Sequence, residues 1–177
     1  MPLGSAEALA LAGMMGSGKT TVAAELARLL GRRVVSTDAE VVRRAGKPIA
    51  AVFAEDGEAA FRALERAVVA SLAGPVVVDL GGGAFCDPAT AGRLLATARV
   101  VFLDVSPAEA ARRIAADPGA GVRPLLERWA ALAARRRPLY LRAHHRVEVD
   151  GLAPEAVARR ILELVAPPRR EPLLEGA

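Results

Sequence analysis

A glycine-rich run between an apolar segment and an amphipathic segment constrains the fold of this chain more than any other feature. The apolar segment covers residues 8–12, and the amphipathic segment covers 20–30. The run between them fits the spacing G-x-x-x-x-G-K-[ST] at every position, with Gly13, Met14, Met15, Gly16, Ser17, Gly18, Lys19 and Thr20. A strand, a glycine-rich turn and a helix in this order indicate an α/β fold built on a parallel sheet.

This run has the composition of a phosphate-binding loop. Its glycines let successive backbone N–H groups turn inward and hold an anion at the N-terminus of the following helix. Lys19 is then expected to reach the β- and γ-phosphates of a nucleoside triphosphate, and the Thr20 hydroxyl to bind Mg²⁺. The alternative, a glycine-rich turn that binds nothing, is disfavoured because the strand, the helix and the Lys-Thr pair are all in place. The pattern does not identify the group that accepts the phosphate.

The rest of the chain alternates between apolar runs and helical patterns. Apolar runs predict further strands at 33–36, 75–80, 100–104 and 146–149. Helical patterns occupy 57–72, 88–98, 107–116, 125–137 and 154–165. Several runs are continuously apolar, as expected for strands buried on both faces of a parallel sheet. We therefore predict a single three-layer α/β domain over residues 1–166, followed by a poorly ordered tail over 167–177.

Composition excludes several classes of protein. With 53% apolar residues in 177, the chain is not intrinsically disordered, and a single cysteine, Cys86, rules out a disulfide scaffold. No apolar run reaches the roughly 18 residues of a membrane span. A signal peptide has a basic stretch before its apolar segment, and no such stretch precedes segment 8–12. We therefore expect a cytoplasmic protein without a membrane partner.

The basic residues are unusual, because all 24 except Lys19 and Lys47 are arginines. The sequence pI of about 10.2 is typical of proteins that bind nucleic acid. The net charge is only +4, however, and most arginines lie in pairs beside acidic residues. A run of three arginines at 135–137 has no interleaved aromatic residues and is typical of a solvated helix end. We expect no nucleic-acid partner.

Two carboxylates follow predicted strands, at the edge where the glycine-rich loop is expected. Asp79 ends an apolar strand and is a candidate to hold Mg²⁺ through water, although a residue there can also cap a turn. Asp38 follows the second strand, within Ser36-Thr37-Asp38. A carboxylate at that point can accept or orient the proton of an attacking hydroxyl, and it can equally serve as a helix N-cap.

Two further clusters bear on the phosphate acceptor. Arg62 lies three residues before Glu65 on a predicted helix, and that spacing alone favours a surface ion pair. Gly81, Gly82 and Gly83 directly follow the third strand. They either allow a small polar ligand to approach backbone N–H groups or form a flexible turn, and the sequence favours neither.

Taken together, these clusters resemble the shikimate kinase family. Motifs in the family's order and approximate spacing run from about Leu9 to Leu164: the phosphate loop, Thr37-Asp38, Gly57-Glu58 with Phe61-Arg62, Leu80 with the three glycines, Arg123-Pro124-Leu125-Leu126, and Arg136 before Pro138-Leu139-Tyr140. The resemblance implies a P-loop kinase fold of the nucleoside monophosphate kinase type. Such a fold has a five-stranded parallel sheet in the order 2-3-1-4-5, helices on both faces and a mobile lid, here at about 117–126.

The resemblance also implies a reaction, the transfer of the γ-phosphate of ATP to the 3-hydroxyl of shikimate with Mg²⁺. Lys19 and Arg123 match residues that act on the phosphates, Arg123 from the lid, and Asp38 matches the aspartate that binds the shikimate hydroxyls and acts as base. Arg62 and Arg136 match the arginines that grip its carboxylate. The acceptor residues implied in this way are Asp38, Arg62, Gly81, Gly82, Gly83 and Arg136. We expect the chain to act as a monomer.

This chain departs from the family pattern at the magnesium site. Ser36 stands where the family commonly has an aspartate associated with Mg²⁺, and Asp79 stands where it usually has no acid. We hypothesise that Asp79 takes over that role through water. The lid is a few residues longer than is usual, and either Arg112 or Arg113 is expected to stack on adenine.

Two alternative functions are also compatible with parts of the sequence. One is another small P-loop kinase, acting on gluconate or a nucleotide, but Arg62, Arg136 and the three glycines suit a small carboxylated polyol better. The other is a non-catalytic ATP-binding or RNA-binding protein, suggested by the arginine content and the missing aspartate at Ser36. Steep salt dependence of nucleic-acid binding would distinguish that protein from a kinase.

Overall fold

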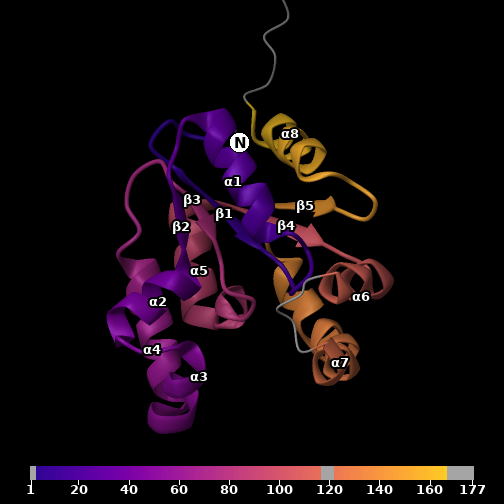
Figure 1. Ribbon diagram of the computed structural model, residues 1–177. Coiled ribbons are helices and arrows are strands. Elements are labelled where there is room, and N and C mark those ends of the chain that lie inside the picture. Colours follow the sequence, from indigo (N-terminus) through magenta and orange to yellow (C-terminus); the bar gives the residue numbers. More distant parts are fainter. Residues whose placement is uncertain (1–2, 117–121, 167–177) are drawn as a thin grey trace, which may run out of the picture.

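Five parallel strands form one sheet in the order β2-β3-β1-β4-β5, which confirms the predicted order (Figure 1). The computed structural model describes residues 3–116 and 122–166, and of residues 122–128 the backbone only. The strands are β1 (Ala8–Ala12), β2 (Val34–Ser36), β3 (Val77–Asp79), β4 (Ala98–Asp104) and β5 (His145–Glu148). Within the described residues, no helix is long and apolar enough to cross a lipid bilayer.

Strand β1 lies at the centre of the sheet, between β3 and β4. Its sequence alternates alanine with leucine, and all five residues are buried. Because side chains alternate between the faces of a strand, Leu9 and Leu11 project to one face while the alanines project to the other. A strand that is apolar on both faces needs a helical layer on each, and this centres the core on the strand that leads into the glycine-rich loop.

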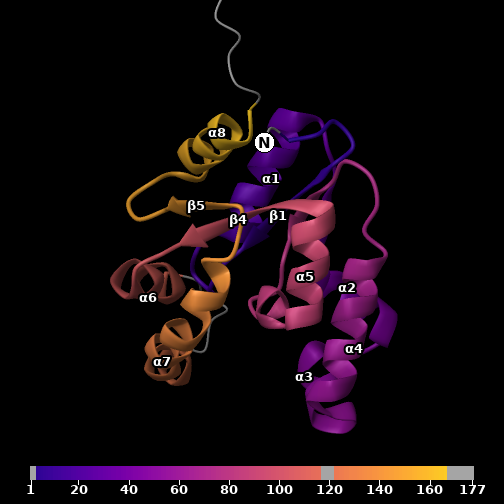
Figure 2. The ribbon, with the colours of Figure 1, turned by 180° about the vertical axis from the view of Figure 1, so that it is seen from behind.

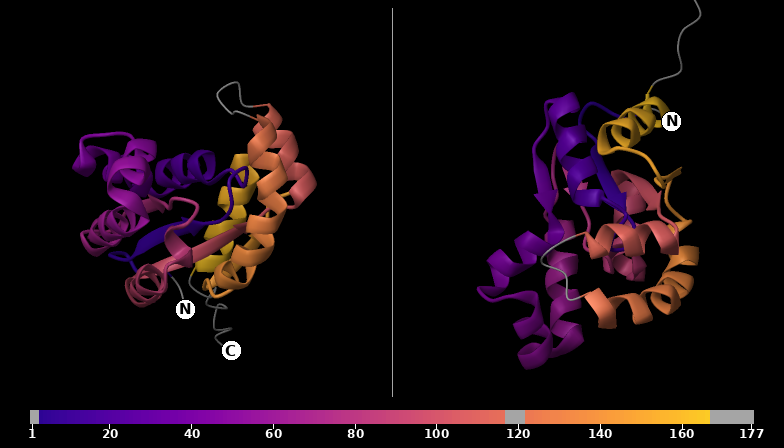
Figure 3. Two further views of the ribbon diagram at one scale, coloured as in Figure 1. Left: turned by 90° about the horizontal axis from the view of Figure 1, so that it is seen from below. Right: turned by 45° about the vertical axis from the view of Figure 1, so that its right-hand side comes forward.

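Helices cover both faces of this sheet. Helices α1 (Lys19–Leu30) and α8 (Pro154–Val165) pack together over one face, and α5 (Pro88–Thr97) lies on the opposite face (Figures 1 and 2). The remaining helical elements are α2 (Thr37–Ala45), α3 (Ile49–Ala51), a π-helical turn (Val52–Asp56), α4 (Gly57–Ala70), a 3₁₀ turn (Ala84–Cys86), α6 (Pro107–Ala115) and α7 (Val122–Tyr140). Figure 3 shows α2, α3 and α4 grouped on one side of the molecule, with α6 and α7 on the other.

Two helical regions differ from the sequence-based expectation. A helix was expected to open at Ser36-Thr37-Asp38, and α2 is that helix, with Ser36 rather than Asp38 as its N-cap; α3 and the π-helical turn, which precede position 57, were not predicted. The helix predicted at 125–137 is α7, which begins at Val122 and continues through Pro138 to Tyr140. Proline normally restricts the residue before it, but Pro138 lies in the last turn of α7, where the missing N–H costs a single intrahelical hydrogen bond.

The lid and the tail are described only in part. Of the lid predicted at 117–126, residues 117–121 lie outside the described part of the chain, and 122–126 form the start of α7. The tail predicted at 167–177 also lies outside the described residues.

Candidate active site

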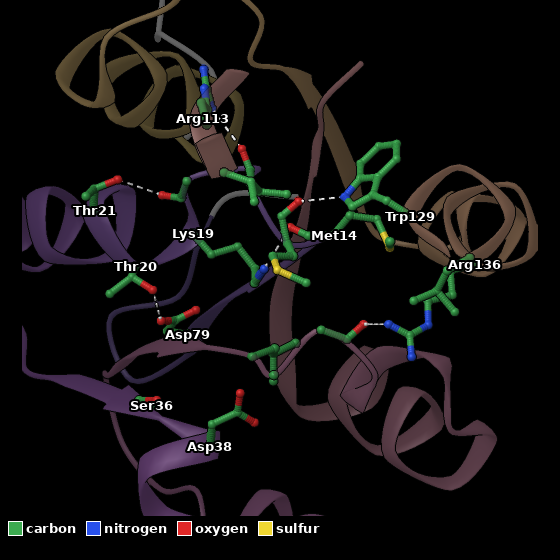
Figure 4. Close-up of a pocket in the computed structure, with 18 residues that line it drawn as sticks. Met14, Lys19, Thr20, Thr21, Ser36, Asp38, Asp79, Arg113, Trp129 and Arg136 are labelled. Atoms are coloured by element: carbon green, nitrogen blue, oxygen red, sulfur yellow. Dashed lines mark hydrogen bonds between the residues drawn. The ribbon is translucent and has the colours of Figure 1, made fainter. Parts of the chain in front are cut away.

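A cavity of about 840 Å³ lies at the carboxyl edge of the sheet, between the two groups of helices (Figure 4). Residues from the glycine-rich loop and from α1, α2, β3, α6 and α7 contribute to it, so its wall is assembled from segments that are distant in the sequence. The lining residues are Met14, Met15, Gly16, Gly18, Lys19, Thr20, Thr21, Ser36, Asp38, Asp79, Leu80, Gly81, Gly82, Arg113, Ile114, Trp129, Leu132 and Arg136. The glycine-rich loop, Asp38, Asp79, two of the three glycines and Arg136 therefore share one cavity, as the motifs require.

The glycine-rich loop turns the chain from β1 into the N-terminus of α1. Gly16 and Gly18 have φ values of 82° and 84°, in the left-handed region that favours glycine, and Gly18 is the N-cap of α1. A methyl group on Gly16 would lie 3.1 Å from the backbone of Ala110, so the loop packs closely on α6. The arrangement aims backbone N–H groups and the positive end of the α1 dipole at the cavity, which makes it an anion site.

Lys19 places a half-buried ammonium group inside this loop. Its Nζ donates hydrogen bonds to the carbonyls of Gly13 (3.0 Å) and Met14 (3.1 Å). Burial lowers the pKa of Lys19, and the negative charges of Asp79 and Asp38 oppose that shift. A compact cation held this way is suited to the oxygens of a bound phosphate chain.

Thr20 and Asp79 form the part of the site that is chemically suited to magnesium. The Thr20 hydroxyl, in the first turn of α1, donates to the Asp79 carboxylate at the end of β3 over 2.7 Å (Figure 4). Both are oxygen donors, which Mg²⁺ prefers, and Mg²⁺ usually keeps several waters and binds substrate phosphates as well. No cluster of three or more acidic, histidine or cysteine ligands occurs among the described residues. The pair therefore fits a water-rich magnesium ion held jointly with phosphates.

Ser36 lies beside Asp79 and caps a helix, whereas an aspartate at this position would offer a carboxylate to the magnesium site. It is the register partner of Asp79 in the pairing of β2 with β3. Its hydroxyl accepts a hydrogen bond of 3.3 Å from the N–H of Ala39 and so caps α2. Of the two neighbouring positions, only Asp79 offers a carboxylate to the cavity.

Asp38 projects from the first turn of α2 toward the loop of glycines. A methyl group on Gly81 would overlap the Asp38 carboxylate, so a glycine is required for the two to approach. The neighbouring Thr37 fixes this geometry, because its hydroxyl accepts a 2.8 Å hydrogen bond from the N–H of Gly81. Burial and the nearby Asp79 charge raise the pKa of Asp38, while Lys19 opposes the increase. A carboxylate with a raised pKa is a stronger base than usual.

Arg62 and Glu65 form a partly buried ion pair, so the expectation of a surface pair is wrong. Glu65 is only 1% exposed, and its carboxylate accepts a 2.7 Å hydrogen bond from Nη1 of Arg62. Burial raises the pKa of Glu65, and the Arg62 charge opposes that shift. The guanidinium rests against Gly83, where a methyl group would lie 2.9 Å from its Nη1. The spacing of three residues is as predicted, but the packing of α4 buries the carboxylate.

Arg136 approaches the same glycines from α7 and, unlike Arg62, is among the residues that line the cavity. Its Nη1 donates to the Gly82 carbonyl over 3.1 Å, and a methyl group on Gly83 would lie 3.4 Å from its Nη2. The Tyr140 hydroxyl, one turn further along α7, donates to the same Gly82 carbonyl. Two guanidinium groups from different helices thus converge on one short loop, and this arrangement suits a carboxylate ligand.

The structure gives mixed results for the three other predicted arginines, Arg112, Arg113 and Arg123. Arg113 lines the cavity and donates to the Ser17 carbonyl over 3.2 Å and to the Val149 carbonyl over 2.7 Å. Arg112 has a side chain that is 69% exposed and is not among the lining residues. Arg123 lies in the first turn of α7, and its side chain is outside the described part of the structure.

Trp129 belongs to none of the sequence motifs, yet it makes a polar contact within the site. It is 5% exposed, lines the cavity and donates its indole N–H to the Met15 carbonyl over 3.0 Å (Figure 4). The two residues are 114 positions apart, so no local pattern could indicate the contact.

Comparisons with known proteins agree with this geometry. A family model described as shikimate kinase matches residues 15–166. The shikimate kinase of Mycobacterium tuberculosis is 42% identical over 167 residues, which cover 89% of this chain and 93% of that protein. A solved structure of shikimate kinase from Acinetobacter baumannii in complex with shikimate has a TM-score of 0.82 at 32% identity, covering 91% of this chain and 93% of that one.

A more distant structure shows how far the fold extends beyond this family. A gluconokinase from Sinorhizobium meliloti has a TM-score of 0.63 at 20% identity, covering 91% of this chain and 92% of that one, and so shares the fold alone. The family match extends over most of the chain and includes Lys19 and the loop of three glycines. This chain belongs to the shikimate kinase family.

Proposed function

We propose that the cavity binds ATP at the glycine-rich loop and shikimate at the loop of three glycines, and that it transfers the γ-phosphoryl group of ATP to the 3-hydroxyl of shikimate. Membership in the shikimate kinase family supports both substrates. The observation that carries the proposal for this chain is the convergence of Asp38, Arg62 and Arg136 on glycines 81–83, opposite the loop that holds Lys19.

On the acceptor side, two arginines bind the substrate carboxylate and one aspartate binds its hydroxyls. Arg62 and Arg136 bind the substrate carboxylate, and their planar forks fix its orientation as well as its charge. Asp38 accepts hydrogen bonds from the substrate hydroxyls and takes the proton of the attacking one. Its raised pKa favours this proton transfer.

On the donor side, the loop and α1 hold the phosphate chain. Lys19 and the loop N–H groups neutralise the transferring phosphoryl group. Thr20 and, through water, Asp79 hold Mg²⁺, which supplies positive charge between the phosphates when bound. Of the two candidates to stack on adenine, we propose Arg113, because it lines the cavity whereas the Arg112 side chain is exposed. Arg123, at the start of α7, adds charge to the phosphates when the lid closes.

A coupled assay for ADP release tests the proposal. We expect release to depend on both Mg²⁺ and shikimate, with gluconate and nucleoside monophosphates inactive as acceptors. The chain is expected to act as a monomer without nucleic acid, which gel filtration of the assayed protein can check. ADP release that shikimate does not stimulate, in the presence of Mg²⁺, would overturn the proposal.

A further inference from the structure

Helix α7 contacts the glycine-rich phosphate loop and the loop of three glycines, here called the acceptor loop, through residues on one of its faces. Trp129 and Arg136 are seven positions apart, which is about two helical turns, and therefore project from the same side. Trp129 binds the Met15 carbonyl in the phosphate loop, and Arg136 binds the Gly82 carbonyl in the acceptor loop. Arg136 is proposed to bind the substrate carboxylate, whereas the proposed reaction does not explain the hydrogen bond of Trp129.

The planarity of the peptide bond gives the Trp129 contact a consequence for phosphate binding. In a trans peptide, the carbonyl of one residue and the N–H of the next point in opposite directions. Because Trp129 Nε1 holds the Met15 carbonyl at 3.0 Å, it also sets the direction of the Gly16 N–H. The N–H groups of this loop are the donors that cradle a phosphate, so their direction determines how well it binds.

The peptide between Met15 and Gly16 is enclosed by a turn in which the Ser17 N–H donates to the Met14 carbonyl over 3.2 Å, but that hydrogen bond does not involve the Met15 carbonyl. Gly16 has no side chain and a φ of 82°, so its own conformation restrains the peptide weakly. On its other side, α6 packs against the loop through Ala110, and Arg113 binds the Ser17 carbonyl at 3.2 Å. These contacts act on Gly16 and on the carbonyls that follow it; among the described residues, the side chain that donates to the Met15 carbonyl is Trp129.

We propose that Trp129 is a positioning residue for the phosphate loop, whose indole N–H orients the Gly16 N–H toward the phosphates of the nucleotide. The inference rests on the proposed function in that the bound phosphates are those of ATP. This positioning role differs from a packing role, because it depends on the indole N–H alone and affects binding of the phosphates but not of the adenosine.

Two replacements separate the hydrogen bond from the packing. Trp129→Phe removes the N–H and part of the ring, while replacement of Trp129 by 3-benzothienylalanine keeps the bicyclic shape and removes only the donor. Losing one neutral hydrogen bond should weaken binding of ADP and of inorganic pyrophosphate by about two- to tenfold. Binding of adenosine, which has no phosphate, and the KM for shikimate should stay within about twofold of the parent values.

Tyr140→Phe is the matched control, because it deletes a hydroxyl that donates to the Gly82 carbonyl on the acceptor side and whose contact with the phosphate loop is a weak one of 3.8 Å to the Met14 sulfur. It should raise the KM for shikimate and leave ADP affinity unchanged. Competition against a fluorescent ADP analogue measures the affinities, and steady-state kinetics gives the KM values. Unchanged pyrophosphate affinity in the benzothienylalanine protein would overturn the inference, as would an equal loss of affinity for pyrophosphate, adenosine and shikimate.

The same measurements distinguish this inference from the proposed function. If the parent chain shows no shikimate-dependent release of ADP, the proposed function fails. Binding of pyrophosphate to the parent and to the two Trp129 replacements still decides whether the indole N–H positions the loop.

Discussion

The Thr20 hydroxyl donates a 2.7 Å hydrogen bond to the Asp79 carboxylate, which joins the first turn of α1 to the end of β3. This contact brings a hydroxyl of the phosphate loop to a carboxylate that lies 59 residues further along the chain. The two oxygens form one side of the proposed magnesium site, and the first prediction concerns the carboxylate.

Asp79→Asn should raise the Mg²⁺ concentration needed for half-maximal activity. A carboxylate that holds the ion through water contributes charge that an amide cannot replace, so an increase of about tenfold or more is expected. Titration of ADP release with Mg²⁺ at saturating ATP and shikimate measures it. Thr20→Ser, which keeps a hydroxyl, is the control and should stay near the parent value. A Mg²⁺ requirement that is unchanged in Asp79→Asn would show that Asp79 only caps the strand.

Glu65→Gln should weaken shikimate binding and destabilise the fold. The neutral amide leaves the Arg62 guanidinium partly uncompensated and less firmly oriented, so the KM for shikimate should rise about tenfold. Loss of this buried charge-assisted bond should lower the free energy of unfolding by about 1–3 kcal/mol. Kinetics and urea denaturation measure the two effects.

Glu58→Gln is the matched control for this change. Glu58 also approaches Arg62, at 3.4 Å, but its side chain is 71% exposed. An exposed pair of this kind contributes at most about 1 kcal/mol, so KM and stability should barely move. If both variants behave alike, burial of Glu65 has no part in positioning Arg62.

Gly81→Ala should reduce kcat/KM for shikimate by about 100-fold, because a catalytic group displaced by 1 Å can cost that much. The added methyl group overlaps the Asp38 carboxylate and must push it away from the acceptor. Gly92→Ala provides the control, since that methyl group meets nothing within 4 Å. It lies inside α5 and should stabilise the protein by about 0.5–1 kcal/mol without loss of activity. Steady-state kinetics of both variants tests the contrast, and wild-type activity in Gly81→Ala would contradict it.

The pH profile of kcat/KM should report the ionisation of Asp38. The base must be deprotonated to accept a proton, so activity is lost as pH falls through its pKa, which burial and Asp79 raise above the usual value. In Asp79→Asn one negative neighbour disappears, the Asp38 pKa falls, and the acidic limb should move to lower pH. Profiles recorded at saturating Mg²⁺ measure this, and an acidic limb at the same pH in both proteins would exclude Asp38 as the titrating base.

The features that the sequence predicts well are those with a strong local or periodic pattern. The loop from Gly13 to Thr20 was identified from spacing alone, and the strand order followed from the family that the motifs resemble. Strand β1 and the run Val100–Leu103 within β4 stand out because they are continuously apolar, as expected for central strands of a parallel sheet. The segment from Ile49 to Asp56 was missed, because its two helical elements are too short to show an apolar periodicity.

The features that escaped prediction depend on contacts between distant segments. Spacing gives the Arg62–Glu65 pair but not the burial of Glu65, which follows from how α4 packs. The two interpretations of the three glycines could be separated only once Asp38 and Arg62 were found against Gly81 and Gly83. Residue-by-residue roles at the site remain predictions, which the experiments above address.

The pairing of β2 with β3 has a consequence for how related enzymes are compared. Ser36 and Asp79 sit at the same level of the sheet on adjacent strands, which run about 4.8 Å apart. An ion held through a layer of water tolerates such a displacement of its carboxylate, so the acid can change strands during evolution while the metal keeps its place. A homologue that lacks the acid in one column of an alignment should therefore be inspected at the neighbouring strand before it is classed as inactive.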